Sequence, residues 1–426
     1  MSKFQLIFTG IFGVFIIVGV AVFSTYRGSS QDAVTVTVWG TIPQSTFSSI
    51  IGQTTLHQSK EYTVNYVEKS EANFDRDFVE ALASGVGPDL FMLRSDKILT
   101  HRNKIFPIPY NIFTQRQFRD SFIEGTEIYM TPEGILAMPV YADPLVMYWN
   151  RSIFNQALLT QPPVYWDEFY RLAQTISIKD GSLNILRSAV ALGEYSNIVN
   201  AKSIFLNLAM QAGTPVVAWD GNNLRVIFNL TFNKPIAPAE LAVNFYTEFS
   251  NPSRSTYSWN RSLPNSTNYF LGGDLAIYFG FASEISNLQV RNPNLNFDVA
   301  SVPTSREGGE NIVYSKFNGF AITNASRNKN AAFVVASILS GRDSASAIAN
   351  GLRLPPVRRD LLSVRQTDAY QVVFYNSAIK ARSWLDPNPD ATNSIFREMI
   401  ESITSGRVRT GEAINRANNE IYNLLK

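Results

Sequence analysis

Short strand patterns and helical patterns take turns through the first part of the chain. Residues 34–38 and 62–66 alternate apolar and polar side chains with a period of two, which is typical of half-buried β-strands. Residues 47–51 and 74–82 place apolar side chains at helical spacing, and the apolar run in 85–93 predicts another strand. Strands that alternate with helices in this order are typical of a parallel α/β sheet.

The rest of the chain is more helical. Apolar stripes predict helices over 166–176 and 201–213, and two more over 395–403 and 414–424 at the C-terminus. Residues 250–268 are rich in Asn, Ser and Pro, which predicts a loop. The pattern therefore indicates a mixed α/β protein that ends in a pair of helices.

The N-terminal segment has the pattern of a membrane signal. Leu6 to Phe23 form an uncharged run that follows Lys3 and precedes Arg27. At 1.5 Å per residue such a helix would be about 27 Å long, close to the bilayer core. A cleaved signal peptide is the alternative, but its apolar part is usually shorter and ends at small residues. We therefore favour one retained transmembrane helix through residues 6–23, with the body of the chain on the extracytoplasmic side.

Charge and composition exclude several classes of function. The chain has 426 residues, enough for two or three lobes, and a net charge of +2 that belongs entirely to residues 1–30. The remaining body has 35 basic and 35 acidic residues, so nucleic-acid binding is not expected. The absence of Cys excludes disulfides, thiol nucleophiles, cysteine metal sites and an N-terminal lipid anchor.

The remaining metal-binding and basic candidates are few. His57 and His101 have polar sequence neighbours, and we expect both on the surface. The acids of Asp386-Pro-Asn-Pro-Asp390 lack the spacing of a calcium loop and are interpreted as a turn. We expect no cofactor and no metal.

Several short motifs then occur in an ordered series from about residue 34 to 425. In chain order they are GPDL (87–90), GILAMP (134–139), LVMYWN (145–150), PP (162–163), WDEF (166–169), GGDLAI (272–277), VP (302–303), NGFAI (318–322), LPPVRRD (354–360), Trp384 and SGR (405–407). Taken together they resemble the extracellular solute-binding proteins of ABC importers, in the sugar-binding family (family 1) that includes maltose-binding protein.

This resemblance implies a two-lobe, periplasmic-binding-protein-like (class II) α/β fold with a hinge. Residues 1–30 would be the anchor, 31–142 plus 303–325 the first lobe, and 143–302 plus 326–426 the second. The ligand would lie in the cleft between the lobes and drive their closure. The implied function is capture of a mono- or oligosaccharide and its delivery to ABC permease and ATPase subunits by a membrane-tethered monomer that is not an enzyme.

The resemblance, together with the expectation that ligand groups follow strand ends, suggests a set of ligand-binding residues. Aromatic faces would stack on sugar rings, and planar polar groups would pair with hydroxyls. The candidates are Trp39, Thr41, Asp96, Asp143, Glu194, Tyr195, Trp259, Asn260, Phe281, Asn318, Arg353 and Trp384.

Three of the candidates also have a purely structural interpretation. Trp39 could pack in the core, Asp143 could cap a helix, and Asp96 could be an ordinary surface charge. Two other functions also compete with import. A glycosidase or lyase would need two carboxylates across the cleft, for which Asp143 and Glu194 could be imagined. A surface sensor or adhesin could use the same scaffold without a transporter.

Overall fold

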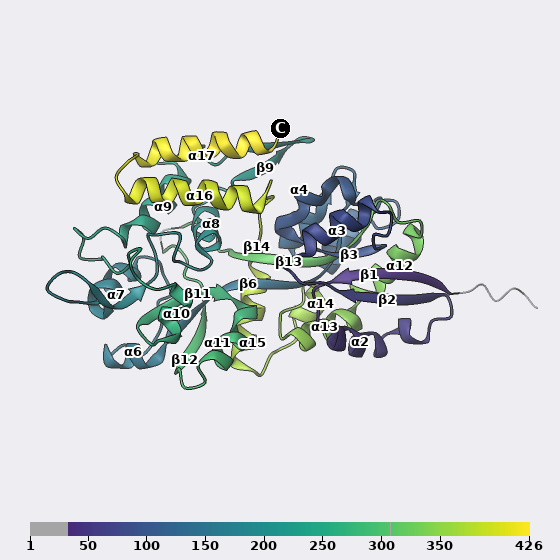
Figure 1. The fold of residues 1–426 in the computed structure, drawn as a ribbon, viewed down its shortest axis with the longest axis horizontal. Coiled ribbons are helices and arrows are strands. Elements are labelled where there is room, and N and C mark those ends of the chain that lie inside the picture. Colours follow the sequence, from purple (N-terminus) through teal and green to yellow (C-terminus); the bar gives the residue numbers. More distant parts are fainter. Residues whose placement is uncertain (1–32, 307) are drawn as a thin grey trace, which may run out of the picture.

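The computed structural model describes residues 33–306 and 308–426 (Figure 1). The predicted membrane segment, residues 6–23, lies outside the described residues. Within the described part of the chain, no helix is both long and apolar enough to cross a bilayer.

A ten-stranded sheet runs through both halves of the molecule, in the order β2-β1-β3-β13-β6-β11-β8-β7, with β12 beside β6 and β14 beside β13. β1 pairs in parallel with β2 and β3, as the alternation of strands with helices along the chain predicted. The strands are β1 (Val34–Gly40), β2 (Tyr62–Glu68), β3 (Leu90–Arg94), β6 (Met138–Asn150), β7 (Ile178–Lys179), β8 (Ile185–Val190), β11 (Leu275–Phe281), β12 (Phe297–Ser301), β13 (Val313–Ile322) and β14 (Ala381–Arg382). Two small hairpins are separate: β4 (Met130–Thr131) with β5 (Gly134–Ile135), and β9 (Val217–Asp220) with β10 (Asn223–Val226).

Two long strands connect the halves, which we call the first lobe (with β1–β3) and the second lobe (with β8, β11 and β12). β6 pairs with β13 as far as Pro144 and with β11 and β12 from Leu145 onward. All of β6 is buried. The change of partner falls between Pro144 and Leu145, two residues after the end of the predicted first-lobe segment 31–142.

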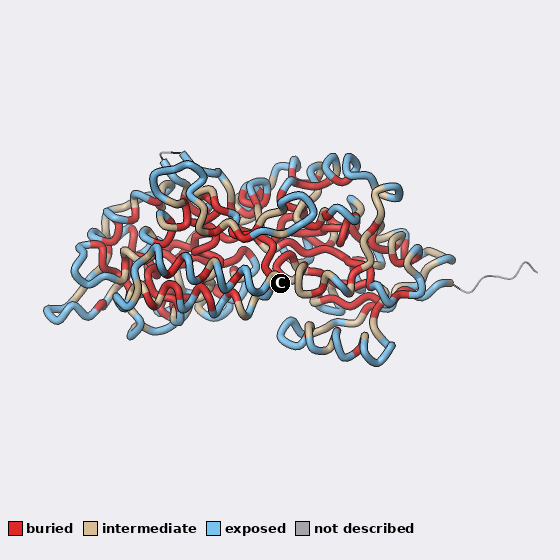
Figure 2. The backbone as a smooth tube through the Cα atoms, turned by 90° about the horizontal axis from the view of Figure 1, so that it is seen from above, coloured by how far each residue is buried: buried red, intermediate tan, exposed pale blue. Residues whose placement is uncertain are grey.

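The helices cover the sheet on the outside. They are α2 (Gln44–Gly52), α3 (Phe74–Ala83), α4 (Ile98–His101), α5 (Gln115–Ser121), α6 (Arg151–Gln156), α7 (Glu168–Ile176), α8 (Ala201–Ala212), α9 (Pro238–Glu248), α10 (Ser266–Leu271), α11 (Ile285–Arg291), α12 (Lys329–Leu339), α13 (Arg342–Leu352), α14 (Arg359–Leu362), α15 (Ala369–Ile379), α16 (Pro389–Thr404) and α17 (Thr410–Leu424). Figure 2 shows the buried backbone as a band through both lobes, with exposed turns and helices around it.

The packing shows where the predicted boundaries and the observed contacts differ. The sequence prediction begins a second-lobe segment at residue 326, whereas α12 packs on β1 and α13 packs on α2 in the first lobe. Near residue 304 the chain still lies against the second lobe, where Thr304 bridges to Tyr165. It returns to the first lobe through β13.

The predicted loop over 250–268 ends earlier than expected. Asn265 caps α10, because its side chain accepts a hydrogen bond from the Thr267 amide at 3.0 Å. The helix therefore begins at Ser266 and ends at Leu271. An Asn/Ser-rich stretch is consistent with both a loop and a helix start, and the cap decides between them here.

Candidate functional site

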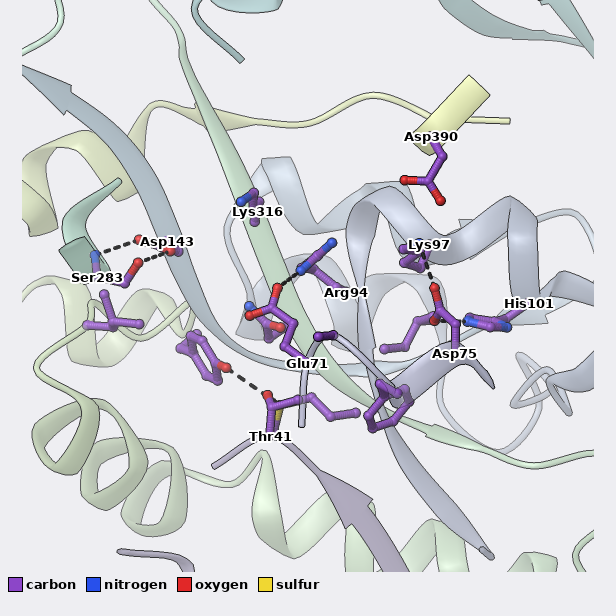
Figure 3. Close-up of a pocket in the computed structure, with 17 residues that line it drawn as sticks. Thr41, Glu71, Asp75, Arg94, Lys97, His101, Asp143, Ser283, Lys316 and Asp390 are labelled. Atoms are coloured by element: carbon purple, nitrogen blue, oxygen red, sulfur yellow. Dashed lines mark hydrogen bonds and ion pairs between the residues drawn. The ribbon is translucent and has the colours of Figure 1, made fainter. Parts of the chain in front are cut away.

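A cavity of about 690 Å³ has walls from both lobes (Figure 3). The first lobe contributes side chains from the end of β1, from α3 and from the end of β3. The second lobe contributes Ser283 from a short 3₁₀ turn (Ala282–Glu284) and Asp390 from the start of α16. The cavity is lined by Thr41, Glu71, Ala72, Phe74, Asp75, Met92, Leu93, Arg94, Lys97, His101, Tyr141, Asp143, Ser283, Lys316, Asn318, Leu354 and Asp390.

One charged cluster on the first-lobe wall is centred on Arg94. Its Nε and Nη2 donate to the two carboxylate oxygens of Asp96, at 2.6 and 2.9 Å, and its Nη1 pairs with Glu71. Burial opposes ionisation of Asp96, but the Arg94 guanidinium outweighs it and holds the pKa of Asp96 below its usual value. This bidentate geometry fixes the guanidinium plane in the cavity wall.

A second cluster lies beside the first and is formed by Asp75, Lys97 and His101. The Asp75 carboxylate lies 2.6 Å from Lys97 Nζ and 2.9 Å from His101 Nε2. The hydrogen bond with His101 and the pairing with Lys97 hold the pKa of Asp75 well below its usual range, although burial acts in the opposite direction. Asp75 lies in the first turn of α3, where the helix dipole also favours an acid.

The predicted surface position of His101 is wrong, whereas His57 is exposed as expected. The His101 ring packs edge-on against Phe78 and Phe91, with ring centroids 5.4 and 6.0 Å apart, and only 2% of the residue is exposed. Both phenylalanines lie on other elements, Phe78 on α3 and Phe91 on β3. Its polar sequence neighbours therefore gave no indication of this apolar environment.

Asp143 lies where β6 passes from one lobe to the other. Its carboxylate accepts hydrogen bonds from the Ser283 amide at 3.0 Å and from Ser283 Oγ at 2.6 Å. Burial raises the pKa of Asp143 to about 6, while the bonds from Ser283 and the charge of Lys316 act in the opposite direction. Asp143 thus connects the crossing strand to the second-lobe wall.

Asp390 is the acidic group of the second-lobe wall. Asn388 caps α16 by accepting hydrogen bonds from the Asp390 and Ala391 amides at 3.2 and 3.1 Å, which leaves the Asp390 side chain directed toward the cavity (Figure 3). Among residues 33–306 and 308–426, no hydrogen bond or ion pair to its carboxylate is found. The two charged clusters around Arg94 and Asp75 are internally paired, whereas Asp390 has no such partner among the described residues. Lys316, on β13, lies over the Phe281 ring.

Residues 40–342 match the family described as bacterial extracellular solute-binding protein. The chain belongs to this family. Family members are binding proteins rather than enzymes, so we interpret the cavity carboxylates as ligand-binding groups rather than as catalytic ones. No curated protein sequence matches this solute-binding protein.

Solved structures with the same fold cover almost the whole chain. A cyclo/maltodextrin-binding protein complexed with maltotetraose has a TM-score of 0.73 at 14% identity over 91% of this chain and 96% of its own. A cyclic α-maltosyl-1,6-maltose binding protein from Arthrobacter globiformis has a TM-score of 0.75 at 16% identity, over 92% of this chain and 99% of its own. An ABC transporter solute-binding protein from Thermotoga lettingae, bound with α-D-tagatose, has a TM-score of 0.64 at 19% identity, over 92% of this chain and 100% of its own. At these identities the likeness shows the two-lobe fold alone.

Three of the predicted ligand residues of this solute-binding protein line the cavity: Thr41, Asp143 and Asn318. Two more lie directly behind the lining. Asp96 is bonded to Arg94, and the Phe281 ring lies under Lys316, whose Nζ is 3.9 Å from the ring centroid.

The other predicted residues lie outside the cavity lining. Trp39 packs beside Phe78 and under Lys69, Trp384 is 2% exposed, and Trp259 is fully buried with its indole nitrogen bonded to Asn197. These tryptophans pack in the core, an alternative that the sequence analysis considered for Trp39. The polar ones bond elsewhere: Glu194 to Arg261, Tyr195 to Asn393, Asn260 to Tyr257 and Arg353 to Asp368. Direct ligand contact at these positions stays a prediction.

Sequence reasoning did not select most of the charged lining residues. Arg94 was the easiest of them to find from the sequence, because it lies four residues after the GPDL motif and only two before the predicted Asp96. Asp390 stood in a Pro-rich segment that was interpreted as a turn, although Asn388 followed by Pro389 is also a helix-start pattern. No group of three or more His, Cys, Asp and Glu side chains suited to a metal ion is found in the described part of the chain.

Proposed function

We propose that this protein is the extracytoplasmic solute-binding subunit of an ABC importer and that it captures a carbohydrate between its lobes. The observation that carries the proposal is a cavity between the lobes that is lined by guanidinium, carboxylate, amide and hydroxyl groups. Such groups pair with sugar hydroxyls, and Phe74 and Tyr141 offer aromatic faces at the same site. Its volume is within the range of small-molecule sites. Three similar structures are described as proteins that bind maltotetraose, a cyclic maltosyl sugar or tagatose.

The proposed mechanism is closure of the lobes around the ligand. The long strands β6 and β13, with the Ser283–Asp143 bond that joins the second-lobe wall to β6, form the connection about which the lobes would move. The ligand stabilises the closed arrangement by contacting both walls at once. A permease that recognises the closed arrangement would then receive the ligand.

The location of the protein follows from its N-terminal sequence and its family. We propose that residues 6–23 anchor the chain in the membrane as a single span, and that the body acts as a monomer outside the cytoplasm. Within the body we propose that 33–142, 313–362 and part of the crossing strands form the first lobe, since α12, α13 and α14 pack there. The remainder would form the second lobe.

Ligand-dependent stabilisation of the full chain, purified in mild detergent, tests the proposal. Maltotetraose, maltose, tagatose, amino acids and polyamines are compared by thermal shift, and small-angle scattering then measures compaction with each ligand that stabilises the chain. We expect at least one saccharide to raise the melting temperature and to reduce the radius of gyration. Stabilisation by none of them, or only by amino acids or polyamines, would contradict carbohydrate binding. Co-purification of a permease and an ATPase separates an importer subunit from a surface sensor.

A further inference from the structure

Lys202 lies behind the second-lobe wall of the cavity, at the start of α8. Its amino group donates hydrogen bonds to Asp386 Oδ2 at 2.5 Å, to Thr392 Oγ1 at 2.7 Å and to the Pro389 carbonyl at 3.0 Å. Only 15% of the Lys202 side chain and 1% of the Asp386 side chain are exposed. A buried amino group with three short bonds to one segment fixes that segment more firmly than a surface ion pair could.

The bound segment is itself closed by further hydrogen bonds. Asp386 Oδ1 accepts from Thr392 Oγ1 at 2.8 Å and from the Asn388 amide at 3.2 Å. Residues 386–392 therefore form a small bonded unit with the Lys202 amino group beneath it. This unit links β14, which pairs with the crossing strand β13, to the first turn of α16.

Asp390 lies inside this unit, directly after Pro389 and two residues before Thr392, both of which Lys202 binds. Tyr195 adds a second support, because its hydroxyl donates to Asn393 Oδ1 at 2.8 Å. The Asp390 carboxylate is the charged group that the second lobe presents to the cavity. Its position relative to the first-lobe wall is thus determined by groups that do not line the cavity themselves.

We propose that Lys202 is a positioning residue of the ligand site: it sets the place of Asp390, and Tyr195 assists it. The inference rests on the proposed function, since it assumes that the cavity holds the ligand. It also gives the loop around Tyr195, expected from the sequence to contact sugar, a role one step removed from the ligand.

Amide hydrogen exchange tests the positioning without any ligand. The full chain is compared with Lys202→Met, and Lys329→Met is the matched control. Lys329 also stands at a helix start and also donates to a backbone carbonyl, that of Ser326 at 2.9 Å, but it lies in the first lobe away from the cavity. We expect exchange over 386–396 to accelerate about tenfold in Lys202→Met and to be unchanged in the control. Unchanged exchange over 386–396 would overturn the inference.

Ligand affinity, measured by calorimetry with maltotetraose as the probe, tests whether Lys202 acts through Asp390. We expect Lys202→Met and Asp390→Asn each to weaken binding about tenfold, and the double variant to bind no more weakly than either single one. A double variant weakened about a hundredfold would mean independent effects and would overturn the inference. If the wild-type chain does not bind maltotetraose, the proposed function fails for this ligand, and the exchange result alone decides the inference.

A second variant keeps the test decisive if Lys202→Met does not fold. Lys202→Met leaves the Asp386 carboxylate buried without its cation, whereas Lys202→Met combined with Asp386→Asn leaves no buried charge. Tyr195→Phe removes a single hydroxyl and is expected to act in the same direction, with about a threefold change in affinity. Full wild-type exchange and affinity in both of these variants would overturn the inference.

Discussion

The two walls of the cavity differ in whether their charged side chains are paired with other groups of the protein. On the first-lobe wall, Arg94 is bonded to Glu71 and Asp96, and Asp75 is bonded to Lys97 and His101. On the second-lobe wall, Ser283 is bonded to the crossing strand, and Asp390 has no partner among the described residues. The first wall pairs its Arg94 and Asp75 clusters internally, whereas the Asp390 carboxylate of the second wall can pair with what enters the cavity.

This difference indicates a division of labour between the lobes. A preorganised wall lowers the entropy lost on binding, so the first lobe is suited to capture the ligand. A wall with an unpaired group gains more from contact with the ligand, so the second lobe is suited to report that capture by closing. The predictions below change one wall or the connection between them.

The largest effect is expected from Arg94→Gln, which breaks the first wall. The change leaves the Asp96 carboxylate, only 8% exposed, without its cation, and it releases Glu71. We expect a loss of about 3 kcal/mol in the free energy of unfolding and at least a tenfold loss of ligand affinity. Urea denaturation and calorimetry measure the two quantities.

Arg116→Gln is the matched control for this change. Arg116 pairs with Asp120 one turn along α5, and both side chains are largely exposed, so its loss should cost less than about 0.5 kcal/mol. Equal losses for Arg94→Gln and Arg116→Gln would contradict the view that the Arg94–Asp96 pair is buried and fixed in the first wall.

The next largest effect concerns pH and the connection between the walls. Because burial raises the pKa of Asp143 to about 6, the folded state holds its proton more tightly than the unfolded chain does. This contribution to stability is complete below the unfolded pKa near 3.8 and disappears as the pH rises through about 6. We expect the wild-type chain to lose about 2–3 kcal/mol relative to Asp143→Asn between pH 4 and pH 7. Thermal unfolding of both chains across this range measures the difference.

Asp75, in the first wall, should make stability depend on pH in the opposite direction. The pKa of Asp75 is lowered, so its contribution is present above the unfolded pKa and is lost as the pH falls below about 4. A stability difference between wild type and Asp143→Asn that does not change from pH 4 to pH 7 would show that the Asp143 carboxyl is not buried in solution.

A smaller effect is expected from Ser283→Ala. The change removes the 2.6 Å bond from Ser283 Oγ to Asp143 but keeps the bond from the backbone amide. We expect the binding free energy to weaken by about 1 kcal/mol, which is about a fivefold lower affinity. The reason is that Ser283 is held less firmly against the crossing strand when the lobes close on the ligand. Affinity that is unchanged while stability falls would restrict this bond to a structural role.

The sequence predicted the fold well because its signals are local or ordered along the chain. The alternation in 34–38, the apolar spacing of 74–82 and the apolar stripe in 201–213 each describe one element, and each element is present. The ordered motifs then indicated how the elements are arranged. None of these inferences required knowledge of which distant residues touch.

The site was harder to predict because it depends on such distant contacts. Arg94 and Glu71 lie on different elements, and Asp390 meets the cavity from a helix nearly 300 residues later. Large aromatic residues favoured by a sugar-binding interpretation, such as Trp259, are equally suited to the core, and the structure places that ring there. His101 shows the converse, since a residue with polar neighbours in sequence is buried edge-on against two phenylalanines.

The smallest effect is expected at a contact between the lobes that lies outside the cavity. The β9–β10 hairpin of the second lobe reaches toward α4, and the guanidinium of Arg102 lies 5.2 Å from the Trp219 ring centroid (Figure 1). The Arg102–Trp219 contact forms while both lobes line the cavity. It should therefore stabilise the relative position of the lobes that binds ligand. A partly exposed cation–π pair contributes about 0.5–1 kcal/mol, so Trp219→Ala should weaken affinity about two- to fivefold. A double-mutant cycle with Arg102→Ala, measured by calorimetry, isolates the pair from the Arg102–Glu133 ion pair. Tighter binding in Trp219→Ala would mean instead that this contact holds the walls apart, and the second lobe would then close against a restraint rather than with its help.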